Sequence, residues 1–300
     1  MFKCLIVYFS GNLSFASVTG NRKENMTVKA DFHVHSHHSG DSNTPMESQI
    51  LAALDRGLEI LCFTEHFDMD WPYQNTPDLP PGFFDLDLGS YREEFLALKD
   101  KYRDRIDIRM GIELGLQPHL GRELAAYMKD NPVFDFVIGS THVSHGMDPY
   151  YSVFFEGLTE KEAWRRYFED ALSSITAFHD IDTYGHLDYV VRYGPTKDTF
   201  YDWEEFSDVI EAILEVLVKN GICLEINTAN LVKGCRMPSP APGILKRYRE
   251  MGGPGVTVGS DAHVPDCLAA YFDQAACILK EAGLHYYTVF KNRQKEHLPL

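Results

Sequence analysis

Short apolar runs alternate with amphipathic helical patterns along most of this chain, and this alternation limits its possible folds more than any other feature. Strands that alternate with helices pair in parallel and are covered by those helices, so the pattern predicts an α/β fold. The seven predicted strands cover residues 28–34, 58–64, 106–113, 134–140, 182–186, 222–227 and 256–260. An eighth apolar run at 286–290 is expected either to close the sheet or to lie across its end.

The predicted helices are bounded by recognisable start and stop signals. They are expected from Thr44 to Gly57, after capping boxes at Ser90/Glu93 and Thr159/Glu162, and over 122–129, 203–219, 243–251 and 268–282. No linker or repeat interrupts the alternation, which favours a single domain over residues 27–295. Residues 1–26 are expected to be a poorly ordered or extra N-terminal segment.

Composition excludes several kinds of partner. The chain has 28 Lys and Arg residues against 44 Asp and Glu, a net charge of −16 that disfavours nucleic acid and anionic membrane surfaces. No apolar stretch approaches the roughly 18 residues of a membrane-spanning helix. The six cysteines have no paired CxxC spacing, so we expect reduced core thiols and a cytoplasmic location.

Side chains that can bind metal follow nearly every predicted strand. In chain order these are His33 and His35, Glu65 and His66, Glu113, His142, His186, Asn227, and Asp261 with His263. The carboxyl ends of parallel barrel strands meet on one face, so these side chains are expected to form one cluster. The imidazoles in this set favour Zn²⁺, Mn²⁺ or Fe²⁺ over Mg²⁺, and the cluster is large enough for two to three ions.

The sequence blocks around these residues resemble a known superfamily. DFHVHSHHSGDS, ILCFTEHFD, MGIELG, FDFVIGSTHV, YGHLDYVVRYG, LEINT and VTVGSDAH match, in order and spacing, the motifs of the polymerase and histidinol-phosphatase (PHP) superfamily. The fuller pattern is similar to its monofunctional histidinol-phosphatase branch. The resemblance implies a distorted (β/α)₇ TIM-like barrel with a trinuclear metal site at the C-terminal ends of the strands.

The resemblance also implies a distribution of metal ligands. It assigns His33, His35, Glu113 and Asp261 to one ion, Glu113 with His142 and His186 to a second, and Asp41, His66 and His263 to a third. Some relatives have histidine where this chain has Asp41. His37, His38 and Glu65 lie near the motifs without matching ligand positions and are expected to play structural or supporting roles. The remaining histidines, His119, His179, His285 and His297, are expected on the surface or in the core.

Clustered divalent ions suit the hydrolysis of phosphate esters, because they supply hydroxide near neutral pH and stabilise phosphoryl charge. We expect direct attack by a metal-bridging hydroxide, with Arg192, Lys233 and Arg236 holding the remaining phosphate oxygens. His145 is a further candidate for contact with a substrate oxygen. The proton for the leaving oxygen could come from His145, from a bound water or from Asp261.

Three hypotheses about function follow. The first is a phosphomonoesterase acting on L-histidinol phosphate, for which Glu65 and Asp68 are candidate partners of a cationic group; Asp68 could equally cap a turn in its loop. The second is a PHP phosphoesterase acting on a nucleotide, an oligonucleotide end or a sugar phosphate, and the third is a non-catalytic metal-binding module. The intact ligand set argues against the third and the acidic net charge against a nucleic-acid substrate. The partner expected is a small phosphorylated substrate, with no nucleic acid and no membrane, and a homo-oligomer is possible.

Overall fold

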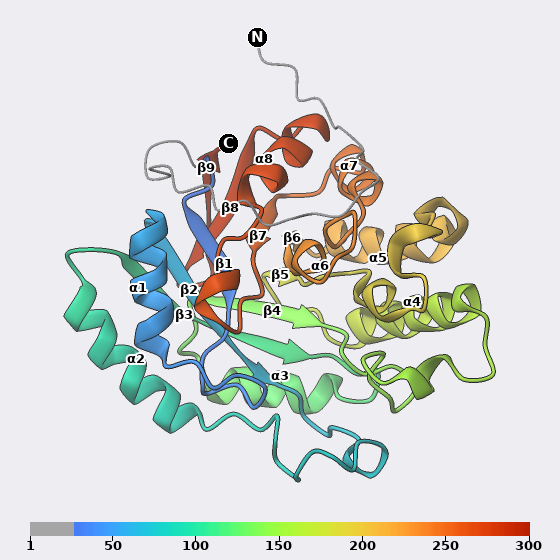
Figure 1. The fold of residues 1–300 in the computed structure, drawn as a ribbon, viewed down its shortest axis with the longest axis horizontal. Coiled ribbons are helices and arrows are strands. Elements are labelled where there is room, and N and C mark those ends of the chain that lie inside the picture. Colours follow the sequence, from blue (N-terminus) through green and yellow to red (C-terminus); the bar gives the residue numbers. More distant parts are fainter. Residues whose placement is uncertain (1–26) are drawn as a thin grey trace.

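A parallel sheet of seven strands forms the centre of the computed structural model, which describes residues 27–300 (Figure 1). The strands are β1 (Ala30–Val34), β2 (Ile60–Phe67), β3 (Asp107–Gly115), β4 (Phe136–Ser140), β5 (Thr183–Tyr184), β6 (Cys223–Asn227) and β7 (Val256–Gly259), and they neighbour one another in chain order. Just beyond β7, Ala262 pairs with Val34, and its carbonyl oxygen accepts the His35 N–H at 3.0 Å. This pairing brings the two edges of the sheet together into a distorted barrel.

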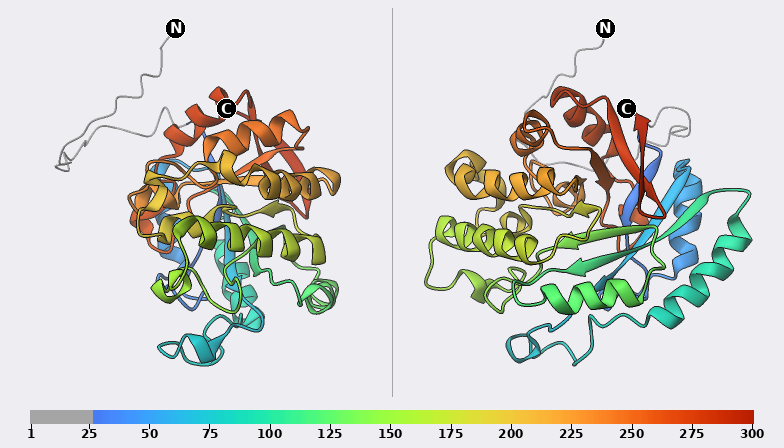
Figure 2. Two further views of the ribbon diagram at one scale, coloured as in Figure 1. Left: turned by 90° about the vertical axis from the view of Figure 1, so that its right-hand side faces the viewer. Right: turned by 180° about the vertical axis from the view of Figure 1, so that it is seen from behind.

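Helices cover the outside of this barrel (Figure 2). They are α1 (Met46–Arg56), α2 (Leu88–Tyr102), α3 (Gly121–Asp130), α4 (Glu160–Ala177), α5 (Ser207–Lys219), α6 (Ala229–Val232), α7 (Pro242–Glu250) and α8 (Phe272–Glu281). The prediction of a distorted (β/α)₇ barrel is therefore confirmed for the described part of the chain. The predicted N-terminal segment, residues 1–26, lies outside the described residues.

The strands and helices form where the sequence gives each a matching apolar pattern. All five residues of β1 are buried, as expected for a parallel strand covered on both faces. In α1, Met46, Ile50 and Ala53 face the barrel, and Gly57 ends the helix with a left-handed φ of 76°. Burial of these apolar faces holds the helices against the sheet. The packed helices in turn fix the position of each strand end.

Two of the predicted helix caps are wrong. Thr44 was expected to cap α1, but its hydroxyl donates instead to the carbonyl oxygen of His263 at 2.7 Å. Ser90 was expected to cap α2, but it lies inside this helix, where its N–H donates to the side chain of Asp87, the actual cap. The capping box at the start of α4 is confirmed, with Thr159 as the cap.

The eighth apolar run forms a hairpin outside the barrel sheet. Strand β8 (Tyr286–Lys291) pairs antiparallel with β9 (Gln294–Pro299). Arg109 at the start of β3 donates to the carbonyl oxygen of Phe290 at 2.7 Å, and Asp135, just before β4, accepts the Asn292 N–H at 3.0 Å. The hairpin therefore lies across the end of the barrel where the strands begin, and leaves the opposite end open for a site.

Reduced core cysteines and the lack of a membrane-spanning helix were also predicted. Cys62, Cys223 and Cys235 are buried in the described structure with reduced thiols, as expected for core cysteines. Of the helices within residues 27–300, none combines the length and the apolar character needed to cross a membrane.

Candidate metal centre

The carboxyl ends of the strands bring the predicted ligands together at one end of the barrel. His33 comes from β1, His35 and Asp41 from the loop after it, His66 from β2, Glu113 from β3, His142 and His186 from the segments after β4 and β5, and Asp261 and His263 from the segment after β7. Groups drawn from this set place their ligand atoms within 4.8 Å of one another. Residues separated by up to 230 positions in the sequence thus form one cluster.

Glu113 lies at the centre of this cluster and is buried. Its Oε1 atom lies 2.9 Å from His186 Nε2 and 3.2 Å from His142 Nε2. Its Oε2 atom lies 3.1 Å from His33 Nε2 and 3.5 Å from His35 Nε2. The two oxygens therefore face two separate sets of imidazoles, which is the arrangement that a carboxylate bridging two ions requires.

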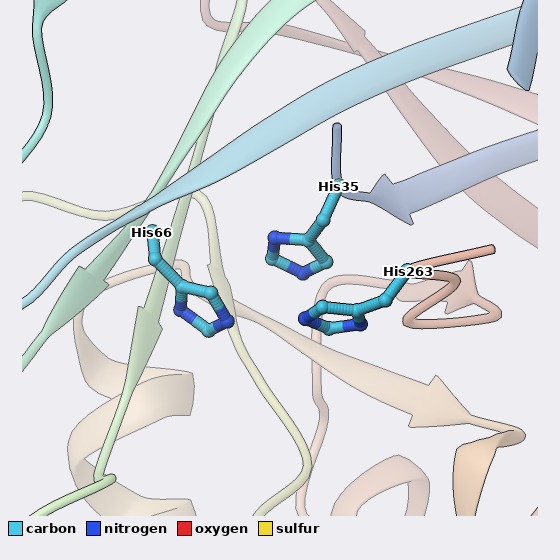
Figure 3. A group of neighbouring side chains, drawn as sticks. All are labelled: His35, His66 and His263. Atoms are coloured by element: carbon cyan, nitrogen blue, oxygen red, sulfur yellow. The ribbon is translucent and has the colours of Figure 1, made fainter. Parts of the chain in front are cut away.

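The outer part of the cluster contains three imidazoles that face one another (Figure 3). The ring of His35 stacks on His66 with centroids 4.3 Å apart and on His263 with centroids 4.2 Å apart. Asp41 approaches the same group, with Oδ2 at 3.0 Å from His263 Nε2 and 3.7 Å from His66 Nε2. Asp41 and His263 are partly exposed, so this part of the cluster faces solvent.

Unpartnered polar atoms show that the cluster suits cations. Within residues 27–300, the buried atoms His33 Nε2, His35 Nε2 and Glu113 Oε2 have no hydrogen-bond partner, although burying such atoms unpaired is costly. Ligands bound at about 2.0–2.1 Å in a tetrahedron lie about 3.3 Å from one another. The nitrogen to oxygen distances around Glu113, between 2.9 and 3.5 Å, agree with this spacing.

A second layer of carboxylates orients these imidazoles. Glu225 Oε1, on β6, lies 2.6 Å from His33 Nδ1. Its Oε2 accepts the backbone N–H of His186 at 2.8 Å. Asp68 lies 2.7 Å from His142 Nδ1, which turns the Nε2 atom of that ring toward Glu113. Fixing one ring nitrogen in this way sets the tautomer and raises the basicity of the other.

Glu65 and Asp68 were considered as partners of a cationic substrate or, for Asp68, as a turn cap, and the structure places both beside the cluster, with Asp68 also lining the cavity next to it. Asp68 is buried against His142. Glu65 is buried as well and accepts hydrogen bonds from the hydroxyls of Ser36 and Ser39. Ser39 Oγ lies 3.2 Å from His35 Nδ1, so Glu65 supports the cluster through the loop after β1.

We expect Glu225→Gln to weaken metal retention by at least about tenfold, because the amide loses the charge that orients and polarises His33. The measurement is metal content of the purified variant after dialysis against increasing chelator, compared with the parent protein. The barrel should stay folded, since the amide can still accept the His186 N–H. Unchanged chelator resistance would contradict this role for Glu225.

Electrostatics of the centre also favour bound cations. Burial lowers the pKa of His33, but the carboxylates of Glu113 and Glu225 more than offset this, so its pKa lies well above the ordinary value. Burial likewise lowers the pKa of His66, whereas Asp41 and Glu113 raise it, to about 9. Burial raises the pKa of Glu113, and the surrounding imidazoles bring it well below its usual range. The buried carboxylates thus require positive charge around them.

A cavity of about 300 Å³ opens onto the exposed side of this cluster. Arg192 lines it, with its guanidinium 4.3 Å from the ring centroid of Tyr189 and Nη1 at 3.4 Å from Asp261 Oδ2. Lys233 lines it as well, next to the hydroxyl of Tyr193 at 3.5 Å. Two of the three predicted phosphate-binding cations therefore lie beside the predicted metal ligands.

The structure does not bring Arg236 and His145 into this cavity. Arg236 Nη2 donates to the carbonyl oxygen of Asp198 at 2.6 Å, which ties this arginine to the segment after β5. His145 Nδ1 lies 2.7 Å from Asp170 Oδ2, in a neighbouring hollow that includes His119. The loop positions of these two residues, rather than their chemistry, separate them from the cluster.

Two residues of the site, Glu225 and Asp148, were not predicted as parts of it. Glu225 has a signal in the LEINT motif, where a carboxylate stands between two apolar residues inside a strand. Asp148 lines the cavity, where burial raises its pKa to about 6, and it accepts from the hydroxyl of Tyr189 at 3.1 Å. Only the path of the loop after β4 brings Asp148 there, so the sequence alone gives no signal for it.

Comparisons with known proteins agree with this geometry. The PHP domain matches residues 31–229 of this chain. A histidinol-phosphatase of Lactococcus lactis is 32% identical over 263 residues, which cover 87% of this chain and 94% of the relative. A probable histidinol-phosphatase of Clostridium acetobutylicum is 32% identical over 254 residues, covering 85% and 94% of the two chains.

A solved structure is similar as well. The crystal structure of the histidinol phosphate phosphatase from Lactococcus lactis, complexed with zinc, L-histidinol and phosphate, superposes with a TM-score of 0.79 at 30% identity. The superposition covers 89% of this chain and 98% of that one. A match to the domain over most of the barrel, together with relatives aligned over nearly their full length, shows that this chain belongs to the PHP domain family.

Proposed function

We propose that this chain is a metal-dependent phosphomonoesterase that hydrolyses L-histidinol phosphate to L-histidinol and phosphate. The observation that carries the proposal is the Glu113-centred cluster, which opens into a cavity containing the guanidinium of Arg192. The Lactococcus lactis relative is named for the same activity, and its structure holds zinc, L-histidinol and phosphate.

The residues around the cavity can each be given a part in this reaction. Divalent ions held by the cluster supply hydroxide near neutral pH and neutralise charge on the phosphoryl oxygens. Arg192 and Lys233 hold phosphate oxygens that face away from the cluster, since both line the cavity. His145 does not line the cavity. Burial raises the pKa of Asp261, but the neighbouring imidazoles and Arg192 bring it well below its usual range, so we assign protonation of the leaving oxygen to solvent.

The cavity suits a small cationic phosphate ester. Its volume of about 300 Å³ lies at the lower end of the range for small-molecule sites. Asp78 and Asp148 line it together with the rings of Tyr150 and Tyr151. Carboxylates and aromatic faces both attract cations, so this wall is suited to an ammonium or imidazolium group.

The proposal also covers the number and identity of the metal ions and the cellular location of the protein. We propose two to three ions of zinc, manganese or iron, with zinc present in the related structure. The ligand sets are those that the PHP resemblance implies, because Glu113 faces two groups of imidazoles and Asp41 approaches a third. We also propose a cytoplasmic location; assembly into a homo-oligomer stays a prediction.

A competitive substrate screen tests the proposed activity. We expect L-histidinol phosphate to be hydrolysed with a higher kcat/KM than nucleoside monophosphates, sugar phosphates or phosphodiesters. Competition is needed because a multinuclear site hydrolyses many esters to some extent. If another ester is turned over at least about tenfold more efficiently, a preference of about 1.4 kcal/mol, the histidinol-phosphate assignment fails while phosphoesterase activity remains.

A further inference from the structure

A second group of metal-binding side chains lies outside the cavity. His37 and His38 follow β1, and Glu94 lies on α2. The Nε2 atoms of His37 and His38 approach the same carboxylate oxygen, Glu94 Oε2, at 3.2 and 2.9 Å. Within the described chain, none of these three residues lines the cavity beside the barrel cluster. The group is therefore separate from the centre described above.

The spacing within this group fits one metal ion. One ligand atom from each residue lies within 4.8 Å of the others. The distances of 2.9 and 3.2 Å are close to the spacing of about 3.3 Å between ligands of a tetrahedral zinc ion. Two imidazoles and one carboxylate are also the protein ligands of a common class of zinc sites that keep a fourth position for water.

The loop that carries the two histidines is held in place by its own hydrogen bonds. The His37 N–H donates to the carbonyl oxygen of Thr44 at 2.8 Å, and Ser36 Oγ donates to Glu65 at 2.6 Å. Gly40 packs closely on another segment, since a Cβ there would lie 1.9 Å from the carbonyl oxygen of Phe83. A fixed loop loses little conformational entropy when its side chains bind an ion.

Exposure of the group makes it accessible from solvent. The His37 side chain is 40% exposed and that of Glu94 34%, whereas His38 is 7% exposed and packs beside Tyr91 with ring centroids 5.5 Å apart. An ion can therefore reach the site without any opening of the barrel. His38 is therefore fixed on the buried side of the loop, while His37 and Glu94 face water.

We propose that His37, His38 and Glu94 bind one divalent transition-metal ion, with zinc as the best match, in addition to the ions of the barrel cluster. The bound ion joins the loop after β1 to helix α2. The same loop carries Ser39, which contacts His35, and Asp41, which contacts His263. The ion therefore stabilises a segment that supports the barrel cluster, and the inference stands whatever the substrate.

Zinc titration of the full chain tests this site. The protein is purified with its barrel ions in place, dialysed, and titrated with zinc chloride by isothermal titration calorimetry. We expect one further equivalent to bind to the parent protein and at least tenfold weaker binding in His37→Ala and in Glu94→Gln. His119→Ala is the matched control, because it removes another exposed histidine, paired with Asp70 at 2.8 Å, and should keep the additional equivalent.

Thermal unfolding provides a second readout that separates loss of the site from loss of the fold. The parent and the His119→Ala control should gain Tm on zinc addition, whereas Glu94→Gln should keep the zinc-free Tm of the parent and gain less. Absence of a further equivalent in the parent would overturn the proposal. Equal uptake by the parent and both variants would overturn it too.

Discussion

Glu113→Gln is expected to remove more than one equivalent of metal and at least about a thousandfold of kcat. The reason is that Oε1 faces His142 and His186, whereas Oε2 faces His33 and His35. A single carboxylate thus faces two groups of ligands. The glutamine side chain of the variant has only one oxygen and carries no negative charge, so it cannot take the place of both carboxylate oxygens. Losing about 4 kcal/mol of charge stabilisation from these ions corresponds to about a thousandfold in rate.

Elemental analysis and kinetics on the same preparations provide the measurement. The control is Glu211→Gln, which makes the same change in a surface carboxylate paired with Arg247 at 2.9 Å and should keep both metal content and kcat. Circular dichroism establishes that the Glu113 variant still folds. If that variant keeps the full metal stoichiometry, Glu113 does not bridge two ions, and the central assignment is wrong.

The barrel cluster was largely predictable because all strands of a parallel barrel end on the same face. His33 lies in β1 and His35 directly follows this strand, two residues further on, so their side chains point the same way wherever the strand lies. His66 and Glu113 stand near the ends of β2 and β3, where register alone brings them opposite each other. Local periodicity is therefore sufficient for these positions, without knowledge of the loops.

The second layer needed information that local periodicity does not contain. Glu225 reaches His33 only because β7 lies between β6 and β1 and has glycine at the crossing point. A Cβ on Gly259 would lie 2.3 Å from Glu225 Oε1 and 2.4 Å from the Cβ of His33. This contact depends on the three-dimensional packing of three strands, which is why the sequence predicted Asn227 and overlooked Glu225.

Loop residues were the hardest to place. His145 was considered near the substrate because it follows His142, but its backbone turns with a positive φ of 52° and its ring meets Asp170. Arg236 was expected to bind phosphate, but Asp198 holds it away from the cavity. Chain distance from a ligand does not give the direction of a loop, so chemistry alone could not distinguish these residues from Arg192.

Arg192→Ala is expected to raise KM for a phosphomonoester by roughly ten- to a hundredfold, with a smaller effect on metal content. Arg192 lines the cavity, and its guanidinium is held against the faces of Tyr189 and Tyr193, at 4.3 and 5.2 Å from the ring centroids. Guanidinium can bind two phosphate oxygens at once, and such a charge-assisted contact contributes about 1.5–3 kcal/mol. Of the described residues that line the cavity, Lys233 is the one other Lys or Arg, so few cations can replace Arg192.

Steady-state kinetics over three variants distinguish a phosphate contact from a merely structural role. Arg192→Lys keeps the charge but not the planar fork, so it should recover only part of the affinity. Arg236→Ala removes the arginine that Asp198 holds outside the cavity and should leave KM unchanged. Because Arg192 Nη1 also lies 3.4 Å from Asp261, metal content is measured for each variant. A KM that rises only in step with lost metal would mean that Arg192 supports Asp261 instead of binding phosphate.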